Sequence, residues 1–510
     1  MSRLFRSFGR LIAIFWVAAR YDLLVLLDMP AVTLLGRLLR RGGVAKLTPG
    51  QRLAQALVAL GPTFIKLGQA LSTRADLVGE EVAADLSELQ DRLPPFPTSQ
   101  ARAIIERELG RPLEELYTSF DPEPVAAASI AQVHFAVTAD GREVAVKVLR
   151  PGVERAFARD VEMLEWLAQG VELITPAFRR LRPVDTVQTL AETIELEMDL
   201  RFEAAAAAEL AENFEGDDSF LVPAVDWTRT ARRVMTLERV SGISVDEREK
   251  LIEAGHDIQV ILKKAADAFF NMVFRDGFFH GDLHPGNLFV NDQGNLVAVD
   301  FGIMGRVDEK TRHFLADMLL GFLNGDYRKV AEVHFAAGYV PAHKSVDAFT
   351  QAARSIAEPI LGRPLHEISV ARLLGQLFEV TETFAMETQP QLLLLQKSML
   401  VAEGLGRRLD PSINMWELAR PLIEGWMASH LGVRARVTQS VKGWAQSLER
   451  LPRLIDFAEH AALSMQSGGL KLHPDTIRAM TGRDSSRPGL IRTWLPWILV
   501  VALSVALALR

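Results

Sequence analysis

The stretch His280-Gly-Asp-Leu-His-Pro-Gly-Asn287, with Asp300-Phe-Gly302 after it, decides the fold of this chain. Between the two motifs lie two apolar runs, 287–290 and 295–299, on either side of a Gly-containing turn, which predicts a pair of short strands. Asp300 therefore directly follows a strand–turn–strand unit. Carboxylate and amide oxygens are the ligands that Mg²⁺ prefers, so we predict that Asn287 and Asp300 hold a magnesium ion.

Upstream, Lys147 ends a Val-Ala-Val-Lys run that predicts another strand. Phosphoryl transfer from ATP needs a cation on the α/β-phosphates, oxygen ligands for Mg²⁺, and a group that orients the acceptor. The run matches the kinase pattern Val-Ala-Ile-Lys, and the five-residue step from Asp282 to Asn287 equals that of the kinase catalytic loop. These elements in this order predict an ATP site with Lys147 on the phosphates and Asp282 as catalytic carboxylate.

Three further motifs surround this site in the sequence: Lys66-Leu-Gly-Gln69, the Ala-rich stretch Ala126-Ala-Ala-Ser-Ile-Ala-Gln-Val-His134, and Glu197-Met-Asp199. Lys66 and Gln69 share one face of a helix. Alone, each motif also fits a plainer interpretation: a polar helix face, an Ala-rich helix start, and solvated acidic side chains. Together with the ATP site they make the chain resemble the UbiB family, atypical kinase-like proteins associated with ubiquinone (coenzyme Q) biosynthesis. The resemblance runs from about residue 50 to 310.

The resemblance implies roles for these residues. The helix with Lys66 and Gln69 is expected to lie over the active site, where an ordinary protein kinase admits its substrate. The Ala-rich stretch would replace the Gly-rich phosphate loop and be stiffer, because each Cβ disfavours positive φ. Its nucleotide-binding positions would be Ala126, Ala127, Ala128, Ser129 and Val133.

The acidic motif implies further site residues. Glu203 is the best candidate for the ion pair that fixes Lys147. On one continuous helix Glu197 and Asp199 point to nearly opposite sides, so both reach Lys66 only if the helix begins irregularly there. Both are carried over as site residues through the resemblance.

Departures from protein kinases limit the reaction. Gly281 stands where those enzymes have Arg, and no Ala-Pro-Glu follows Gly302 before the next helical pattern. The platform for a peptide substrate is therefore expected to be absent. We interpret His284 as a structural histidine that orients the loop rather than as a metal ligand.

Composition excludes other functions. The chain has 510 residues and no cysteine, so disulfides and thiolate metal sites are excluded. A net charge of −7 gives no reason to expect nucleic acid as a partner.

The two ends of the chain indicate a membrane. Residues 1–52 carry nine Lys and Arg against two Asp, interleaved with apolar residues, which suits a helix on an anionic membrane surface. A helix packed on the rest of the protein and a signal peptide remain alternatives. Residues 494–509 carry no charge and predict a single C-terminal span, or a helix that dips into one leaflet. The basic residues before the span predict an inner-membrane protein with a cytoplasmic catalytic domain.

The predicted fold class is α+β: a two-lobed, protein-kinase-like fold with a helical extension, a large helical C-lobe and a membrane anchor. Within it, one helix is predicted over 101–119 and another over 186–214, and Thr63 is a plausible N-cap. The predicted divisions are basic helices at 1–48, the helical extension at 49–120, the N-lobe at 121–242, the C-lobe at 243–480, and the anchor at 490–510.

The leading hypothesis for function is an atypical kinase or ATPase that uses Mg-ATP to support ubiquinone biosynthesis at the membrane. Its expected partners are membrane lipid, lipid or phenolic ubiquinone precursors, and other proteins of that biosynthesis. Two alternatives remain: a small-molecule kinase of the choline or aminoglycoside type, and a nucleotide-sensing scaffold for biosynthetic proteins.

Overall fold

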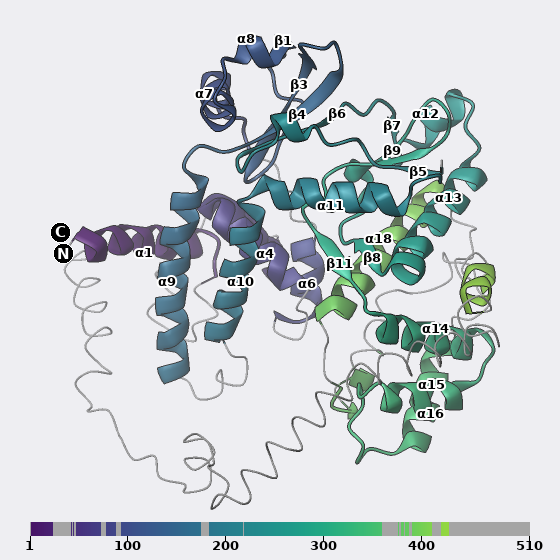
Figure 1. Ribbon diagram of the computed structural model, residues 1–510. Helices are drawn as coiled ribbons and strands as arrows, with labels where there is room; N and C mark the ends of the chain where they lie inside the picture. Colours follow the sequence, from purple (N-terminus) through teal and green to yellow (C-terminus); the bar gives the residue numbers. More distant parts are fainter. Residues whose placement is uncertain are drawn as a thin grey trace, which may run out of the picture. The chain divides into compact units, whose positions relative to one another are not determined.

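The computed structural model describes residues 2–23, 47–72, 78–87, 93–174, 183–217, 219–359, 390–410 and 420–427, with isolated positions between them (Figure 1). The remainder of the predicted C-lobe, 428–480, and the predicted anchor, 490–510, lie outside these residues. No helix within the described ranges is long and apolar enough to cross a bilayer.

An antiparallel sheet forms the part of the chain that holds Lys147. Its strand order is β1-β3-β4-β6, with β2 paired to β3. β3 and β4 form a hairpin in which Gly141 has a φ of 87°, a conformation that favours glycine and agrees with the predicted turn. The strands are β1 (Tyr117–Phe120), β2 (Ala126–Ala127), β3 (Ala131–Thr138), β4 (Glu143–Leu149) and β6 (Val234–Glu238).

One face of this sheet packs on α7 (Thr98–Leu109) and α8 (Leu113–Leu116). The prediction of one helix over 101–119 was wrong, because Gly110 turns the chain with a φ of 67° and Pro112 follows it. The residues after α8 extend into β1 instead. Val144, Val146 and Val148 supply the sheet side of the shared core.

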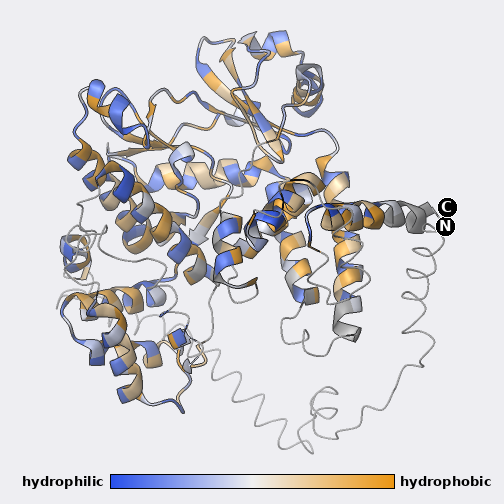
Figure 2. Cartoon of the chain, turned by 180° about the vertical axis from the view of Figure 1, so that it is seen from behind, coloured by the Kyte–Doolittle hydropathy of each residue, from blue (hydrophilic) through white to orange (hydrophobic). Residues whose placement is uncertain are grey.

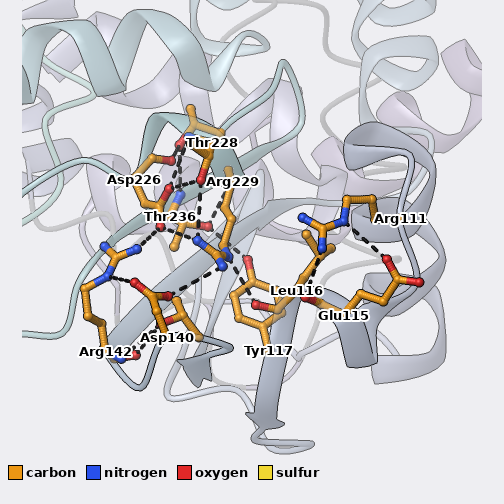
Figure 3. Close-up of polar contacts among 12 residues, drawn as sticks. Arg111, Glu115, Leu116, Tyr117, Asp140, Arg142, Asp226, Thr228, Arg229 and Thr236 are labelled. Carbon is orange, nitrogen blue, oxygen red and sulfur yellow. Dashed lines mark hydrogen bonds and ion pairs between the residues drawn. The ribbon is translucent and has the colours of Figure 1, made fainter.

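A cluster of polar side chains lies around β6 and the turn between β3 and β4 (Figure 3). Asp226 accepts hydrogen bonds of 2.8 Å from both Arg142 and Arg229. Thr236 donates its hydroxyl proton to the Arg229 carbonyl at 2.8 Å, so the buried Tyr117 hydroxyl donates to Thr236 at 3.1 Å. Burial raises the pKa of Tyr117 to about 12.

Two smaller sheets carry the motifs around Asp282 and Asp300. The predicted strands at 287–290 and 295–299 are present as β9 and β10, in a sheet of order β5-β10-β9-β7, while β8 pairs with β11. The strands are β5 (Phe220–Leu221), β7 (Ile243–Ser244), β8 (Phe278–His280), β9 (Leu288–Val290), β10 (Leu296–Ala298) and β11 (Met304–Arg306).

Helices make up most of the remaining described chain. Those before residue 220 are α1 (Ser2–Arg20), α3 (Pro49–Leu60), α4 (Pro62–Ser72), α6 (Glu80–Ser87), α9 (Val153–Ile174), α10 (Pro183–Glu197) and α11 (Leu200–Asn213). Those after it are α12 (Arg248–Glu253), α13 (Ile258–Phe270), the π-helical η5 (Asn271–Asp276), α14 (Glu309–Leu323), α15 (Tyr327–Ala336), α16 (Val346–Ala357) and α18 (Pro390–Leu409).

The buried carboxylate of Asp160 connects the three helices α1, α4 and α9. Figure 2 shows hydrophobic and hydrophilic residues on the same helices, as expected for helices that bury one face. Asp160 on α9 is 2% exposed and accepts hydrogen bonds from Arg10 on α1 at 3.0 and 2.9 Å and from the Thr63 hydroxyl on α4 at 2.8 Å. Thr63 is therefore not the N-cap of α4: the helix begins at Pro62 and the Thr63 side chain crosses to α9.

The predicted continuous helix over 186–214 is two helices. α10 ends at Glu197 and α11 begins at Leu200, with Asp199 between them in an extended conformation. The Asp199 carboxylate accepts a hydrogen bond from the Arg201 backbone N–H at 3.1 Å and caps α11. Because of this break, Glu197 ends one helix and Asp199 caps the next, although the two residues are only two positions apart in the motif.

Candidate active site

Three charged residues from three elements meet around the predicted phosphate-binding lysine. Lys147 on β4 places its Nζ 2.7 Å from Glu203 Oε1 on α11 and 3.3 Å from Asp300 Oδ1, which follows β10. Glu203 Oε1 also accepts the Phe301 backbone N–H at 3.3 Å. Glu203 therefore holds both the lysine strand and the Asp-Phe-Gly segment, and the structure brings together the predicted ion pair.

The charges of this group are mutually stabilised. Burial lowers the pKa of Lys147, but the carboxylates of Asp300 and Glu203 outweigh it and raise that pKa above its usual value. Burial raises the pKa of Glu203, and the Lys147 ammonium offsets only part of this. Burial also raises the pKa of Asp300, whereas Lys147 and Lys66 lower it to a net value of about 2. Asp300 is thus an anion at neutral pH, as a metal ligand must be.

The loop from His280 to Asn287 is held in shape by its own side chains. The Asp282 backbone N–H donates to His280 Nδ1 at 3.1 Å, and the Asn287 side-chain amide donates to the Asp282 carbonyl at 3.0 Å. His280 is fully buried, edge-on to the Phe301 ring at a centroid distance of 5.7 Å. His284 accepts the Gly286 N–H at 3.0 Å, the loop-orienting role predicted for it.

The residues predicted to hold Mg²⁺ suit that ion chemically. Asn287 uses its side-chain nitrogen on the loop, which leaves its carbonyl oxygen for another partner. The Val299 N–H donates to the Asn287 backbone carbonyl at 2.9 Å, so the chain segments of Asn287 and Asp300 lie side by side. Asp300 has a φ of 63°, a left-handed conformation that is uncommon outside glycine and typical of strained functional sites. An amide oxygen and a carboxylate are the donors that Mg²⁺ prefers.

The helix with Lys66 and Gln69 reaches this group from the extension. Lys66 Nζ on α4 lies 2.9 Å from Glu197 Oε2 at the end of α10, and both side chains are nearly buried. The charge of Lys66 also acts on Asp300. Within the described residues the buried Gln69 Oε1 has no hydrogen-bond donor.

The two acidic residues of the Glu-x-Asp motif go to different tasks. Glu197 pairs with Lys66, whereas Asp199 caps α11 and binds the Arg201 guanidinium at 2.9 and 2.6 Å. Arg201 lowers the pKa of Asp199, although burial opposes it. The structure therefore brings Glu197 but not Asp199 to Lys66.

The Ala-rich stretch is a hairpin, so its interpretation as a helix start was wrong. Ala126 pairs with Val133, and Val133 pairs with Lys147 on the next strand. The turn between them, which contains the buried Ser129, is closed by a 2.8 Å bond from the Ala128 N–H to the Ala131 carbonyl. The stretch thus joins the sheet directly beside Lys147.

A residue that the motifs did not reveal holds this hairpin. Arg150 Nε donates to the Ala128 carbonyl at 2.9 Å, and its Nη2 lies 3.4 Å from the Leu93 carbonyl. The guanidinium also lies 5.6 Å from the centre of the Phe96 ring. Arg150 therefore connects the Ala-rich turn to the Pro-rich segment that precedes α7.

A second such residue is Lys397 on α18. Its Nζ lies 3.1 Å from Asp282 Oδ1. It belongs to the helical region after residue 310, where the sequence offers only helical periodicity, so no local signal pointed to it.

Comparisons with known proteins show the family of the chain. Residues 88–334 match the ABC1 atypical kinase-like domain, and residues 353–414 match the UbiB helical domain. The chain is 41% identical over 470 residues to the probable protein kinase UbiB of Marinobacter nauticus, which covers 90% of this chain and 86% of the relative. It is 42% identical to the Aliivibrio fischeri protein of that name (88% and 85% covered) and 41% to that of Pseudomonas paraeruginosa (89% and 86%).

Proposed function

The chain belongs to the UbiB family of atypical kinases, and on that premise we propose that it uses Mg-ATP to support ubiquinone biosynthesis at the membrane. The observation that carries this proposal is the meeting of Lys147, Glu203 and Asp300 beside the loop from Asp282 to Asn287. Its reaction is either ATP hydrolysis coupled to the handling of a lipid intermediate or phosphoryl transfer to a small or lipid acceptor.

Each residue has one task in this reaction. Lys147 is held by its ion pair with Glu203 and binds the negatively charged α/β-phosphates of ATP. The hairpin of Ala126–Val133 lies beside it and covers the nucleotide phosphates. Asp282 accepts the proton of the attacking hydroxyl. Mg²⁺ on Asp300 and Asn287 would neutralise part of the phosphate charge.

The extension supports an acceptor other than a protein. The Lys66 helix α4 is linked to the end of α10 by a nearly buried ion pair, and the Lys66 charge lowers the pKa of Asp300, which supports a position beside the site. This position, together with Gly281 and the missing Ala-Pro-Glu, argues against a platform for a peptide. We propose lipid or phenolic ubiquinone precursors as the molecules that the site serves.

Membrane contact is proposed from the two ends of the chain. On α1, Ile12, Phe15 and Trp16 lie on one helix face and are 48%, 40% and 50% exposed. Exposed apolar residues on a basic helix suit the interface of an anionic bilayer. The uncharged 494–509 stretch supports a single span, with the catalytic part on the cytoplasmic face of the inner membrane.

Nucleotide binding is the primary test. The purified full chain should bind ATP only with Mg²⁺, and Asp300→Asn should abolish this binding. Hydrolysis should rise with anionic lipid vesicles and phenolic ubiquinone precursors, and Asp282→Asn should remove it. Mg²⁺-independent nucleotide binding by the wild type would contradict the proposal.

Complementation separates catalysis from a scaffold role. In a strain that lacks its own homologue, the wild-type chain should restore ubiquinone and Asp282→Asn should not. Full restoration by Asp282→Asn would show that turnover is dispensable.

A further inference from the structure

An ion pair joins the C-terminal part of the described chain to the predicted catalytic carboxylate. Lys397 on α18 and Asp282 are separated by 115 residues, yet their side chains meet at 3.1 Å. Each side chain is 28% exposed. Lys397 is therefore within reach of solvent and of a bound substrate rather than sealed in the core.

Packing of α18 against the loop explains how Lys397 arrives there. Gly281 precedes Asp282, and a Cβ at this position would lie 2.9 Å from Leu394 Cδ1 and 2.9 Å from Ile303 Cγ2. A Cβ at position 281 would require the Leu394 and Ile303 side chains to shift, and glycine allows α18 to approach the loop without that shift. Leu394 and Lys397 are three residues apart and share one face of α18, so the contact that needs Gly281 also directs Lys397 to Asp282.

The other end of α18 is anchored separately. Arg248 on α12 donates to the Leu409 carbonyl at 2.8 Å. The Ser398 hydroxyl, next to Lys397 and fully buried, bonds back to the Leu394 carbonyl at 3.0 Å. Arg248 thus ties the C-terminal end of α18 to α12, while Lys397 contacts Asp282 from the first half of the helix.

The two oxygens of Asp282 have different surroundings. Oδ1 binds Lys397, whereas Oδ2 faces His284 Nε2 at 3.9 Å, too far for a hydrogen bond. Asn287 binds the backbone of Asp282 rather than its carboxylate. One oxygen is therefore held by a cation, and among the residues that the structure describes no hydrogen bond is made to the other, which can receive a proton.

We propose that Lys397 is a positioning residue that aims Asp282 Oδ2 at the attacking hydroxyl. This inference rests on the proposed function. In the step it serves, the acceptor oxygen bonds to the γ-phosphorus of ATP, and the bond from that phosphorus to the β–γ bridging oxygen breaks. ADP leaves with the electron pair, and the acceptor proton passes to Oδ2. With water as acceptor the products are ADP, phosphate and a proton.

The charge of Lys397 is tested by removing and restoring it. Lys397→Ala should lower kcat for ATP hydrolysis by about 10- to 100-fold, since a misplaced general base loses much of its contribution. KM for Mg-ATP should change less than about threefold, because the pair acts on the carboxylate rather than on nucleotide binding. Lys397→Arg should restore part of the rate. The melting temperature of each variant controls for folding.

The absence of cysteine allows a sharper version. Lys397→Cys creates the single thiol of the chain, and 2-bromoethylamine converts it into a side chain of nearly lysine length with an ammonium group. This treatment should restore kcat, whereas iodoacetamide, which adds a neutral amide, should not. Lys263→Cys is the matched control, since Lys263 is 70% exposed on α13 and pairs with Asp267 at 2.8 Å; neither reagent should alter its turnover.

A readout independent of turnover locates the side chain. The alkylation rate of the thiol in Lys397→Cys, followed by mass spectrometry, should fall when Mg-ATP is bound, and the Lys263→Cys thiol should react at an unchanged rate. If the wild type binds Mg-ATP but neither hydrolyses it nor transfers phosphate to a lipid or phenolic acceptor, the proposed function fails, and this protection alone decides whether Lys397 faces the site. Wild-type kcat in Lys397→Ala, equal rescue by both reagents, or no protection would overturn the proposal.

Discussion

Replacing Asp199 tests whether the Glu-x-Asp motif performs one task or two. The Asp199 side chain caps α11, the helix that carries Glu203. Loss of an N-cap costs about 1 kcal/mol. The Arg201 partner adds little to this value because its side chain is 60% exposed. We therefore expect Asp199→Ala to lower the free energy of unfolding by about 1 kcal/mol, roughly 1–2 °C in melting temperature for a chain of this size.

Asparagine separates the cap from the charge. Asn is as good an N-cap as Asp, so Asp199→Asn should unfold within about 0.5 kcal/mol of the wild type. Because Arg201 lowers the pKa of Asp199, the stability that its charge adds is present above the ordinary value of 3.8 and is lost as the pH falls through the lowered pKa. At neutral pH both proteins should hydrolyse Mg-ATP at similar rates.

The matched control is Glu197→Gln, which keeps the α11 cap and removes the charge that pairs with Lys66. The assays are thermal unfolding by circular dichroism and steady-state ATP hydrolysis, on the same preparations. We expect Glu197→Gln to alter kcat and Asp199→Asn to leave it unchanged. If Asp199→Asn lost activity as Glu197→Gln does, with a wild-type melting temperature, then Asp199 would act at the site and the division of the motif would be wrong.

Three other changes test the surroundings of the site. Gly281→Ala should cost about 1–3 kcal/mol of unfolding free energy, because its Cβ would meet Leu394 at 2.9 Å; a wild-type melting temperature would contradict this packing. Arg150→Lys should weaken Mg-ATP binding about fivefold by calorimetry, since loss of the bond to Ala128 removes about 1 kcal/mol of support from the hairpin; unchanged affinity would disprove its role. Tyr117 has a pKa raised to about 12, so its contribution to stability is complete below its ordinary pKa of 10.0 and is lost as the pH rises to about 12. Tyr117→Phe should remove up to about 1.4 kcal/mol of this alkaline loss in urea unfolding compared at pH 8 and 11, and parallel losses in both proteins would refute it.

The ATP site was readable from the sequence because its residues sit on short, regular elements. Lys147 lies in a Val-rich strand, two residues before its end, and Asp300 follows a strand–turn–strand, so local patterning placed both on the correct elements. Glu203 followed from the family resemblance, and the structure pairs it with Lys147 at 2.7 Å. The contacts of the Lys66 helix came from the structure, in which Lys66 pairs with Glu197 and its charge lowers the pKa of Asp300.

Features that depend on chain breaks or distant packing were not predicted. Residues 186–214 have an unbroken helical pattern. Asp is a common N-cap residue, but Asp199 lies in the middle of this pattern, so the start of a second helix was not recognised there. Gly110 and Pro112 marked the end of α7, but the four residues of β1 are too few for strand periodicity to register. The contact between Lys397 and Asp282 is a product of tertiary packing, for which no spacing rule exists.

The position of α18 also has a consequence for synthesis of the protein. All the motifs that predict ATP binding have left the ribosome once Gly302 emerges, but Lys397 has not yet been synthesised or has not yet emerged. Gly302 and Lys397 are 95 residues apart, which at about 5–20 residues per second corresponds to about 5–20 seconds of translation. Throughout that time the nascent chain holds a kinase-like site whose Asp282 has no lysine beside it. If Lys397 positions Asp282 as proposed, full activity is acquired only after α18 has been synthesised.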